Sequence, residues 1–150
     1  MTQDARIVSF ASNVENYLYL DVLSDKMTIG ARRGLIETGK LIEKTTKENI
    51  KNPPKTGKKY KNLRLRSSRA GEYPSNQTGK LRRSIGYQVQ GTKRLFVGAR
   101  ANYASFLAFG TSKMEKRAFI GNVIKDNIEK SYDIISNSIN KELSLWNYQI

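Results

Sequence analysis

Residues 101–120, with the sequence ANYASFLAFGTSKMEKRAFI, decide the fold that we expect for this chain. Asn102 is a suitable N-cap for a short helix, and Gly110 can take the left-handed backbone conformation that ends one. Apolar residues at positions i, i+3 and i+4 predict one buried helix face: Tyr103, Phe106 and Leu107. We therefore expect a buried elbow, anchored by aromatic side chains on both sides, that leads into a final helix.

The composition is that of one globular domain covering residues 1–150. Hydrophobic residues make up 38% of the chain and charged residues 27%, and no apolar run approaches the ~20 residues needed to cross a bilayer. The absence of Cys and His excludes disulfides, thiol nucleophiles, Cys/His zinc sites and imidazole bases. The first residues lack the features of a secretory signal. We expect assembly in the cytoplasm, with no cofactor, metal or membrane contact.

The positive charge is concentrated in the middle third of the chain. The net charge is +14, and residues 51–100 hold fourteen bases against the single acid Glu72, which gives +13. The first and last fifty residues are nearly neutral. A segment of that charge density repels itself unless it is solvated, mobile or facing an anion such as DNA phosphate or an acidic protein surface.

The N-terminal part is expected to form two helices. Residues 4–20 carry an apolar stripe at helical spacing, made of Ile7, Phe10, Ala11, Val14, Tyr17 and Leu18. Ser24 or Asp25 can cap a second helix that ends before Pro53. Three glycines inside the second helix each cost about 1 kcal/mol relative to alanine: Gly30, Gly34 and Gly39. That cost indicates close backbone packing, a kink or a weaker helix.

Residues 51–77 lose all periodicity and are rich in Pro, Gly, Ser, Asn and bases. We expect a long loop, named the basic arm, in which Leu63 and Leu65 permit a short strand. Long loops in a compact domain tend to be functional, or to become ordered on a partner. The candidate DNA- or partner-contacting residues are Lys51, Lys55, Lys58, Lys59, Lys61, Arg64, Arg66 and Arg69, with Tyr60 among them. They could neutralise backbone phosphates without reading sequence.

The residues after the arm predict a single helical turn and then a β-hairpin. Thr78 can cap the turn, residues 79–83. Apolar and polar residues alternate through residues 84–99, with a turn at Gly91 and with Phe96 on the face opposite to the apolar one. The last segment repeats Ile at helical spacing, which predicts one long C-terminal helix. The expected class is α+β, with a small antiparallel sheet packed against the N-terminal helices and the C-terminal helix.

Enzymatic chemistry is poorly supported by the sequence. Gly57-Lys58 and Gly79-Lys80 lack the earlier glycine and the following Ser or Thr of a phosphate-binding loop. The acids are dispersed beside bases, as on solvated helix faces, and not clustered as metal ligands. We therefore expect a protein that is not an enzyme and has no small-molecule substrate. The arm has no helix-turn-helix or RNA-binding aromatic signature, which disfavours sequence-specific regulation.

Two motifs in order resemble the tailed-bacteriophage neck and tail-completion family, the group that includes the lambda minor tail protein Z. The first lies in residues 67–85 and contains Thr78, Gly79, Leu81, Ser84 and Ile85. The second lies in residues 102–120 and contains Tyr103, Ala104, Phe109, Gly110, Thr111, Arg117 and Phe119. The chain differs from the family pattern in carrying Ala108 for an acid and Ala118 for a proline.

The resemblance implies a structural virion protein at the head–tail junction, present as a homo-oligomeric ring around the DNA channel. Its neighbours would be head-closure or adaptor, tail-terminator or tail-tube proteins, with genomic double-stranded DNA passing through. The expected subunit contacts at the elbow are Tyr103, Phe109, Gly110, Thr111, Lys113, Lys116, Arg117 and Phe119. Two alternatives remain: a tail terminator that caps the tail tube, and a free nucleic-acid-binding protein that uses the arm.

Overall fold

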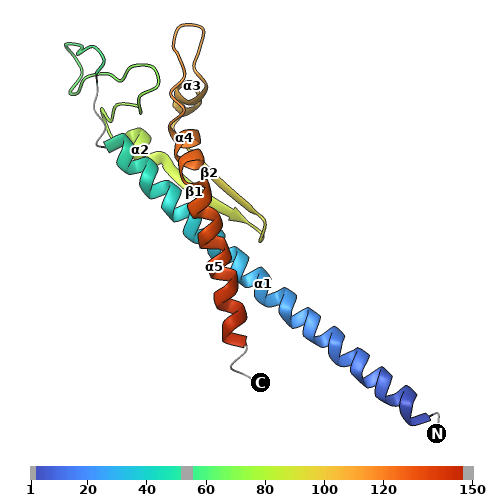
Figure 1. The fold of residues 1–150 in the computed structure, drawn as a ribbon. Coiled ribbons are helices and arrows are strands. Elements are labelled where there is room, and N and C mark those ends of the chain that lie inside the picture. The colour runs from blue at the N-terminus through green and yellow to red at the C-terminus, as the bar shows by residue number, and fades with distance from the viewer. Residues whose placement is uncertain (1–2, 52–55, 147–150) are drawn as a thin grey trace.

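The N-terminal part of the chain forms one helix. The computed structural model describes residues 3–51 and 56–146, and describes side chains from residue 21 to residue 145 of these ranges. Helix α1, Gln3–Lys51, is 49 residues long and extends well past the other elements at its N-terminal end (Figure 1). The expected pair of helices is therefore wrong. Nothing between Leu20 and Asp25 is a proline or glycine, so no residue there forces the helix to end.

The glycines of α1 are explained by close packing. Helix α5, Ile128–Trp146, lies along α1, and a Cβ added at Gly34 would be 2.7 Å from the Cα of Ile135. A Cβ at Gly30 would be 2.6 Å from the Cα of Ile139. Arg33 also forms an ion pair across this contact with the buried carboxylate of Glu142. The sequence left open close backbone packing, a kink or a weaker helix at these glycines. Close backbone packing is confirmed at the α1–α5 contact.

The expected hairpin is confirmed. Strands β1, Ile85–Gln90, and β2, Arg94–Ala99, pair antiparallel from Ile85 opposite Ala99 to Gln90 opposite Arg94. One face of the hairpin lies on α1, where a Cβ at Gly39 would be 2.7 Å from Cγ of Tyr87. Two strands alone are marginally stable in water, so this helix supplies the support that the sheet needs.

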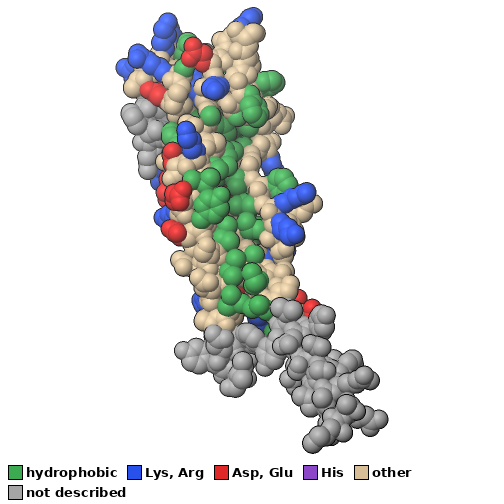
Figure 2. All heavy atoms as spheres, turned by 45° about the vertical axis from the view of Figure 1, so that its right-hand side comes forward, with side chains coloured by type: hydrophobic (Ala, Val, Ile, Leu, Met, Phe, Trp, Pro, Cys, Tyr) green, Lys and Arg blue, Asp and Glu red, His purple; other side chains and the backbone are tan. Residues whose placement is uncertain are grey.

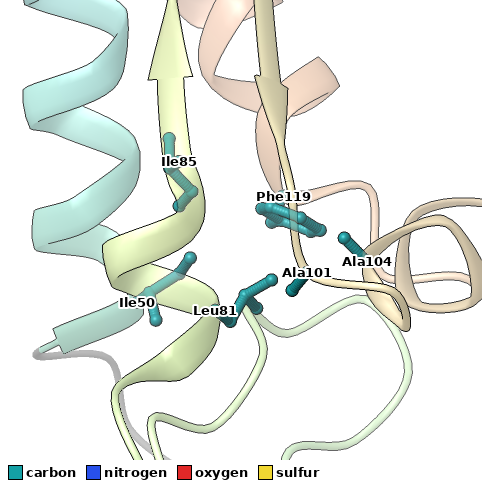
Figure 3. Close-up of a cluster of buried hydrophobic side chains, with 6 residues drawn as sticks. All are labelled: Ile50, Leu81, Ile85, Ala101, Ala104 and Phe119. Atoms are coloured by element: carbon teal, nitrogen blue, oxygen red, sulfur yellow. The ribbon is translucent and has the colours of Figure 1, made fainter.

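The core lies where the base of the hairpin meets the end of α1. Short helix α2, Lys80–Ser84, precedes β1 directly. Figure 3 shows six buried side chains from five parts of the chain pointing toward one another: Ile50, Leu81, Ile85, Ala101, Ala104 and Phe119. Phe119 is 1% exposed, and burying a side chain of this size stabilises the fold by about 1.5–3 kcal/mol. The two sequence motifs therefore meet in this core.

The C-terminal helix is present but divided in two. Helix α4, Phe119–Asp126, is followed by α5, and Asn127 lies between them. The side-chain amide of Asn127 donates to the Val123 carbonyl at 2.9 Å, beside the regular bond from the Asn127 N–H to the same carbonyl at 3.1 Å. The expectation of one uninterrupted helix is corrected at this residue. The class is α+β, with a two-stranded antiparallel hairpin, a long N-terminal helix and a long C-terminal helix.

The elbow differs most from expectation. Helix α3, Ala104–Phe109, starts after Tyr103, and no side chain caps it, so the expected cap at Asn102 is wrong. Gly110 ends the helix as expected with φ +81°, although its ψ of −177° is extended. The expected burial of one helix face is also wrong, since Tyr103 is 38% and Phe106 is 57% exposed. Both side chains project beyond the core that holds Phe119.

Candidate functional site

The basic arm is a folded-back loop. The Gly57 N–H donates to the Ser67 carbonyl, and the Ser67 N–H donates to the Lys58 carbonyl, both at 3.0 Å. These two bonds join the ends of residues 58–67, which carry most of the candidate bases. Gly57 is buried at this closure, where an added Cβ would be 2.8 Å from the Ser67 carbonyl carbon. The arm therefore has a defined base on which its charged tip is held.

A glutamine side chain takes the place of the strand that Leu63 and Leu65 permitted. No strand is assigned in residues 56–77, and the side-chain amide of Gln77 instead bonds the backbone of Leu65 from both ends. Its Oε1 accepts from the Leu65 N–H at 3.0 Å, and its Nε2 donates to the Leu65 carbonyl at 2.8 Å. These two bonds resemble the pair that a residue of a neighbouring β-strand would make. They give hydrogen-bond partners to the N–H and the carbonyl of Leu65.

The only acid of the middle third is used inside the arm. The Glu72 carboxylate accepts from the Thr56 hydroxyl and N–H, and from the Arg69 N–H at 2.9 Å. These bonds, first from the Thr56 hydroxyl and then from the Arg69 N–H, lower the pKa of Glu72 below its ordinary value. Glu72 therefore remains charged while its oxygens are directed to the loop backbone.

The bases of the arm face solvent. Lys58, Lys59, Lys61, Arg64, Arg66 and Arg69 are all exposed, as is Lys51 at the end of α1, while Lys55 lies outside the described residues. The Arg66 guanidinium makes one long bond, 3.4 Å, to the Gly57 carbonyl. Tyr60 is 55% exposed among these bases. Basic side chains gather at the end of the molecule that carries the arm (Figure 2).

The basic surface continues onto α1, which the sequence reading missed. A groove of about 500 Å³ is lined by Lys40, Glu43, Lys44, Lys47, Glu48, Lys51 and Arg82. Glu43 is paired with Lys47 in this groove. The signal was present in the sequence, because lysines at i, i+4, i+7 and i+11 share one helix face.

The loop after α3, residues 110–118, forms a compact projection that we name the finger (Figure 1). Thr111 and Met114 exchange two backbone hydrogen bonds at 2.7 and 3.2 Å. The finger is tied to α3 by the Arg117 N–H, which donates to the Leu107 carbonyl at 2.7 Å. The Arg117 guanidinium in turn donates to the Ser68 carbonyl of the arm at 3.0 Å. One residue therefore joins the finger to the arm.

The predicted contact residues of the elbow separate into exposed and buried groups. Phe109, Thr111, Lys113 and Lys116 are exposed and Tyr103 is 38% exposed, whereas Phe119 lies in the core. Phe119 can therefore support the elbow but cannot itself meet a neighbour.

The first motif builds the turn into the hairpin. Leu81 and Ile85 are core residues, and the Ser84 hydroxyl donates to the Leu81 carbonyl at 2.8 Å. Gly79, at φ +75°, occupies the N-cap position of α2 in place of Thr78. The Thr78 hydroxyl accepts a long bond, 3.4 Å, from the Lys80 N–H. These residues are structural in the monomer.

Within the described residues, no group of three or more His, Cys, Asp or Glu side chains could hold a metal ion. In the same part of the chain, no helix is both long and apolar enough to cross a membrane. No protein-family model, curated protein or solved structure matches this chain. What the chain does must therefore be argued from its own surfaces.

Proposed function

We propose that this chain is a non-enzymatic virion protein of the head–tail junction of a tailed bacteriophage. In this proposal it assembles in the host cytoplasm into a homo-oligomeric ring around the DNA channel and joins the filled head to the tail. The resemblance of its two motifs to the neck and tail-completion family supports the proposal. A position capping the tail tube, as a tail terminator, is the close variant.

One observation carries the proposal: an exposed basic arm, whose only acid bonds within the arm, on a nearly neutral helical scaffold. Residues 58–69 carry six exposed bases and no acid, and the Glu72 carboxylate bonds Thr56 and the Arg69 N–H. An anionic partner would offset the self-repulsion of such a surface. Phosphates of DNA in a channel, or an acidic surface on an adjacent ring, are such partners.

The location of the protein in the virion tests the proposal. Electron microscopy of purified particles should show density for this chain in a ring between the portal and the tail tube. Absence of the chain from mature particles would exclude the head–tail function. Density at the tail end of the junction, directly on the tube, would favour the terminator variant.

The role of the arm is tested by charge removal. Lys58, Lys59 and Lys61 changed together to Gln should reduce head–tail joining or DNA ejection, because three cations leave the tip of the arm. A matched control removes the same charge elsewhere, by changing Lys26, Arg32 and Lys141 to Gln. Normal joining and ejection in both variants would show that the charge of the arm is incidental.

A second candidate, free sequence-independent nucleic-acid binding, is favoured by Tyr60. An exposed aromatic ring between lysines can stack on an unpaired base while the lysines bind phosphates. This candidate predicts binding by the isolated protein, and it fails if no binding to DNA or RNA is detectable at low salt.

A further inference from the structure

Three glycines have no explanation within the chain. The backbone at Gly86, Gly98 and Gly121 does not have the positive φ that would require glycine. A Cβ added at each of them would meet no atom within 4 Å. Gly86 and Gly98 lie directly opposite each other in a hairpin of regular register, so they do not mark a bulge. Glycine within a strand weakens it and often marks a place where another backbone or a ligand approaches closely.

The three glycines line one continuous surface. Gly86 and Gly98 line a hollow of about 250 Å³ on the outer face of the hairpin, beside Phe96 and Arg100. Gly98 and Gly121 also line an apolar groove of about 410 Å³ between β2, α3 and α4. Phe96 is 54% exposed at the hollow and Phe109 is 83% exposed at the groove. Figure 2 shows a band of hydrophobic side chains along this side of the molecule.

The rim of this surface is basic. On the outer face of β2 the side chains that alternate with Phe96 and Gly98 are Arg94 and Arg100, both exposed. The facing residues of β1 on the same side are Gly86, Gln88 and Gln90, so the outer face of the hairpin carries no acid.

The exposed residues at the start of α5 are complementary to this groove in polarity and charge. Ile128 and Tyr132 are 46% and 62% exposed and lie one turn apart on α5, beyond Ile124 at the end of the groove. The neighbouring exposed residues include the acids Asp126, Glu129 and Asp133, together with Lys125 and Lys130, for a net charge of −1. An apolar stripe with acids thus matches an apolar groove with arginines.

We propose that the outer face of the hairpin and its groove bind the exposed part of α5 around Ile128 and Tyr132 of a second copy of this chain. The glycines let the helix of the second copy approach the strands closely, the exposed aromatics are covered, and the arginines face the acids. The contact joins two different surfaces, which is the type that closes into a ring. The inference deepens the proposed ring and takes its biological setting from it.

The first test enlarges a glycine that has room in the monomer. Gly98→Val should leave the urea unfolding of the full-length protein unchanged or make it more stable, because valine favours strands and the added atoms meet open space. Sedimentation velocity should show association of the wild-type protein, weakened at least tenfold in this variant. Asn62→Val, at an exposed position of the arm outside the proposed contact, is the matched control and should associate normally.

The second test identifies the occupant. One variant carries Arg94→Glu and Arg100→Glu, and another carries Glu129→Lys and Asp133→Lys. Each alone should fail to associate, because like charges then face each other, and a mixture of the two should recover association to within about threefold. Recovery on mixing requires that the partner be a copy of this chain.

Three results would overturn the inference: a wild-type protein that stays monomeric up to about 1 mM, normal association of folded Gly98→Val, or no recovery in the mixture. These measurements are made in solution, whereas the head–tail function is tested by location in the virion. A failure of the proposed subunit contact is therefore distinguishable from a failure of the proposed head–tail function.

Discussion

Gly110 shows how one residue fixes the elbow. Its φ of +81° is accessible to glycine, and an added Cβ would be 2.8 Å from the Met114 carbonyl oxygen and 2.9 Å from the Lys116 nitrogen. Gly110→Ala should therefore destabilise the protein by about 2–4 kcal/mol in urea unfolding, through backbone strain and a main-chain clash. Gly71→Ala is the control, because φ there is +79° but the space is open, and about 1 kcal/mol is expected. Equal losses would contradict the role of the clash.

Glu72 gives the arm a dependence on pH. Its pKa is lowered by the Thr56 and Arg69 bonds, so its contribution to the folded arm is complete above the pKa of an unfolded glutamate and is lost as pH falls through the lower, folded pKa. Acid titration followed by NMR should move the amide signals of Thr56 and Arg69 together, with a midpoint below that of glutamate in a short peptide. Glu72→Gln should abolish this titration. A midpoint at or above the peptide value would be contrary evidence.

At the scale of elements, the α1–α5 contact reverses the usual effect of glycine in a helix. Replacing a helical glycine by alanine normally stabilises by about 1 kcal/mol. Here Gly34→Ala should destabilise by about 1–3 kcal/mol, because the new methyl group overlaps the backbone at Ile135. Ser136→Ala, on the exposed side of α5, should change the free energy of unfolding by less than about 0.5 kcal/mol. Stabilisation by Gly34→Ala would show that the helices are not in close contact.

The elements that follow local patterns were predictable from the sequence. The alternation of residues 84–99 gives the hairpin and the side on which Phe96 lies, and the periodicity of residues 119–143 gives the C-terminal helix. The basic arm was also predictable as a loop, and its bases as solvent-facing.

The remaining differences depend on contacts that local patterns do not encode. Asn127 separates α4 from α5 with a backbone at φ −113° and ψ 16°, and a single asparagine in a helical pattern does not predict this break. Phe106 lies at apolar spacing but remains exposed, and the core instead holds Phe119 of α4. The bonding of Gln77 to Leu65 spans twelve residues of loop and has no sequence periodicity.

At the scale of the whole molecule, the separation of charge from scaffold predicts a strong dependence of DNA binding on salt. If the six exposed bases of residues 58–69 each neutralise one phosphate, log K should fall with log salt with a slope of about −5. Changing Lys58, Lys59 and Lys61 to Gln should reduce the magnitude of this slope by about 3. Fluorescence anisotropy with a duplex of arbitrary sequence measures both slopes.

The control for this measurement is the variant that loses Lys26, Arg32 and Lys141, which has the same net charge. Its slope should match that of the wild-type protein, because these residues lie away from the arm. Identical slopes for both triple variants would mean that net charge, and not the arm, attracts DNA.

The bond from Arg117 to the Ser68 carbonyl gives the molecule a route for cooperativity. The guanidinium connects the arm to the finger, and the finger adjoins the groove proposed for the second copy. If an anion binds the arm and a second copy binds the groove, as we propose, both stabilise the same bond. By linkage, the factor by which DNA strengthens subunit association equals the factor by which association strengthens DNA binding.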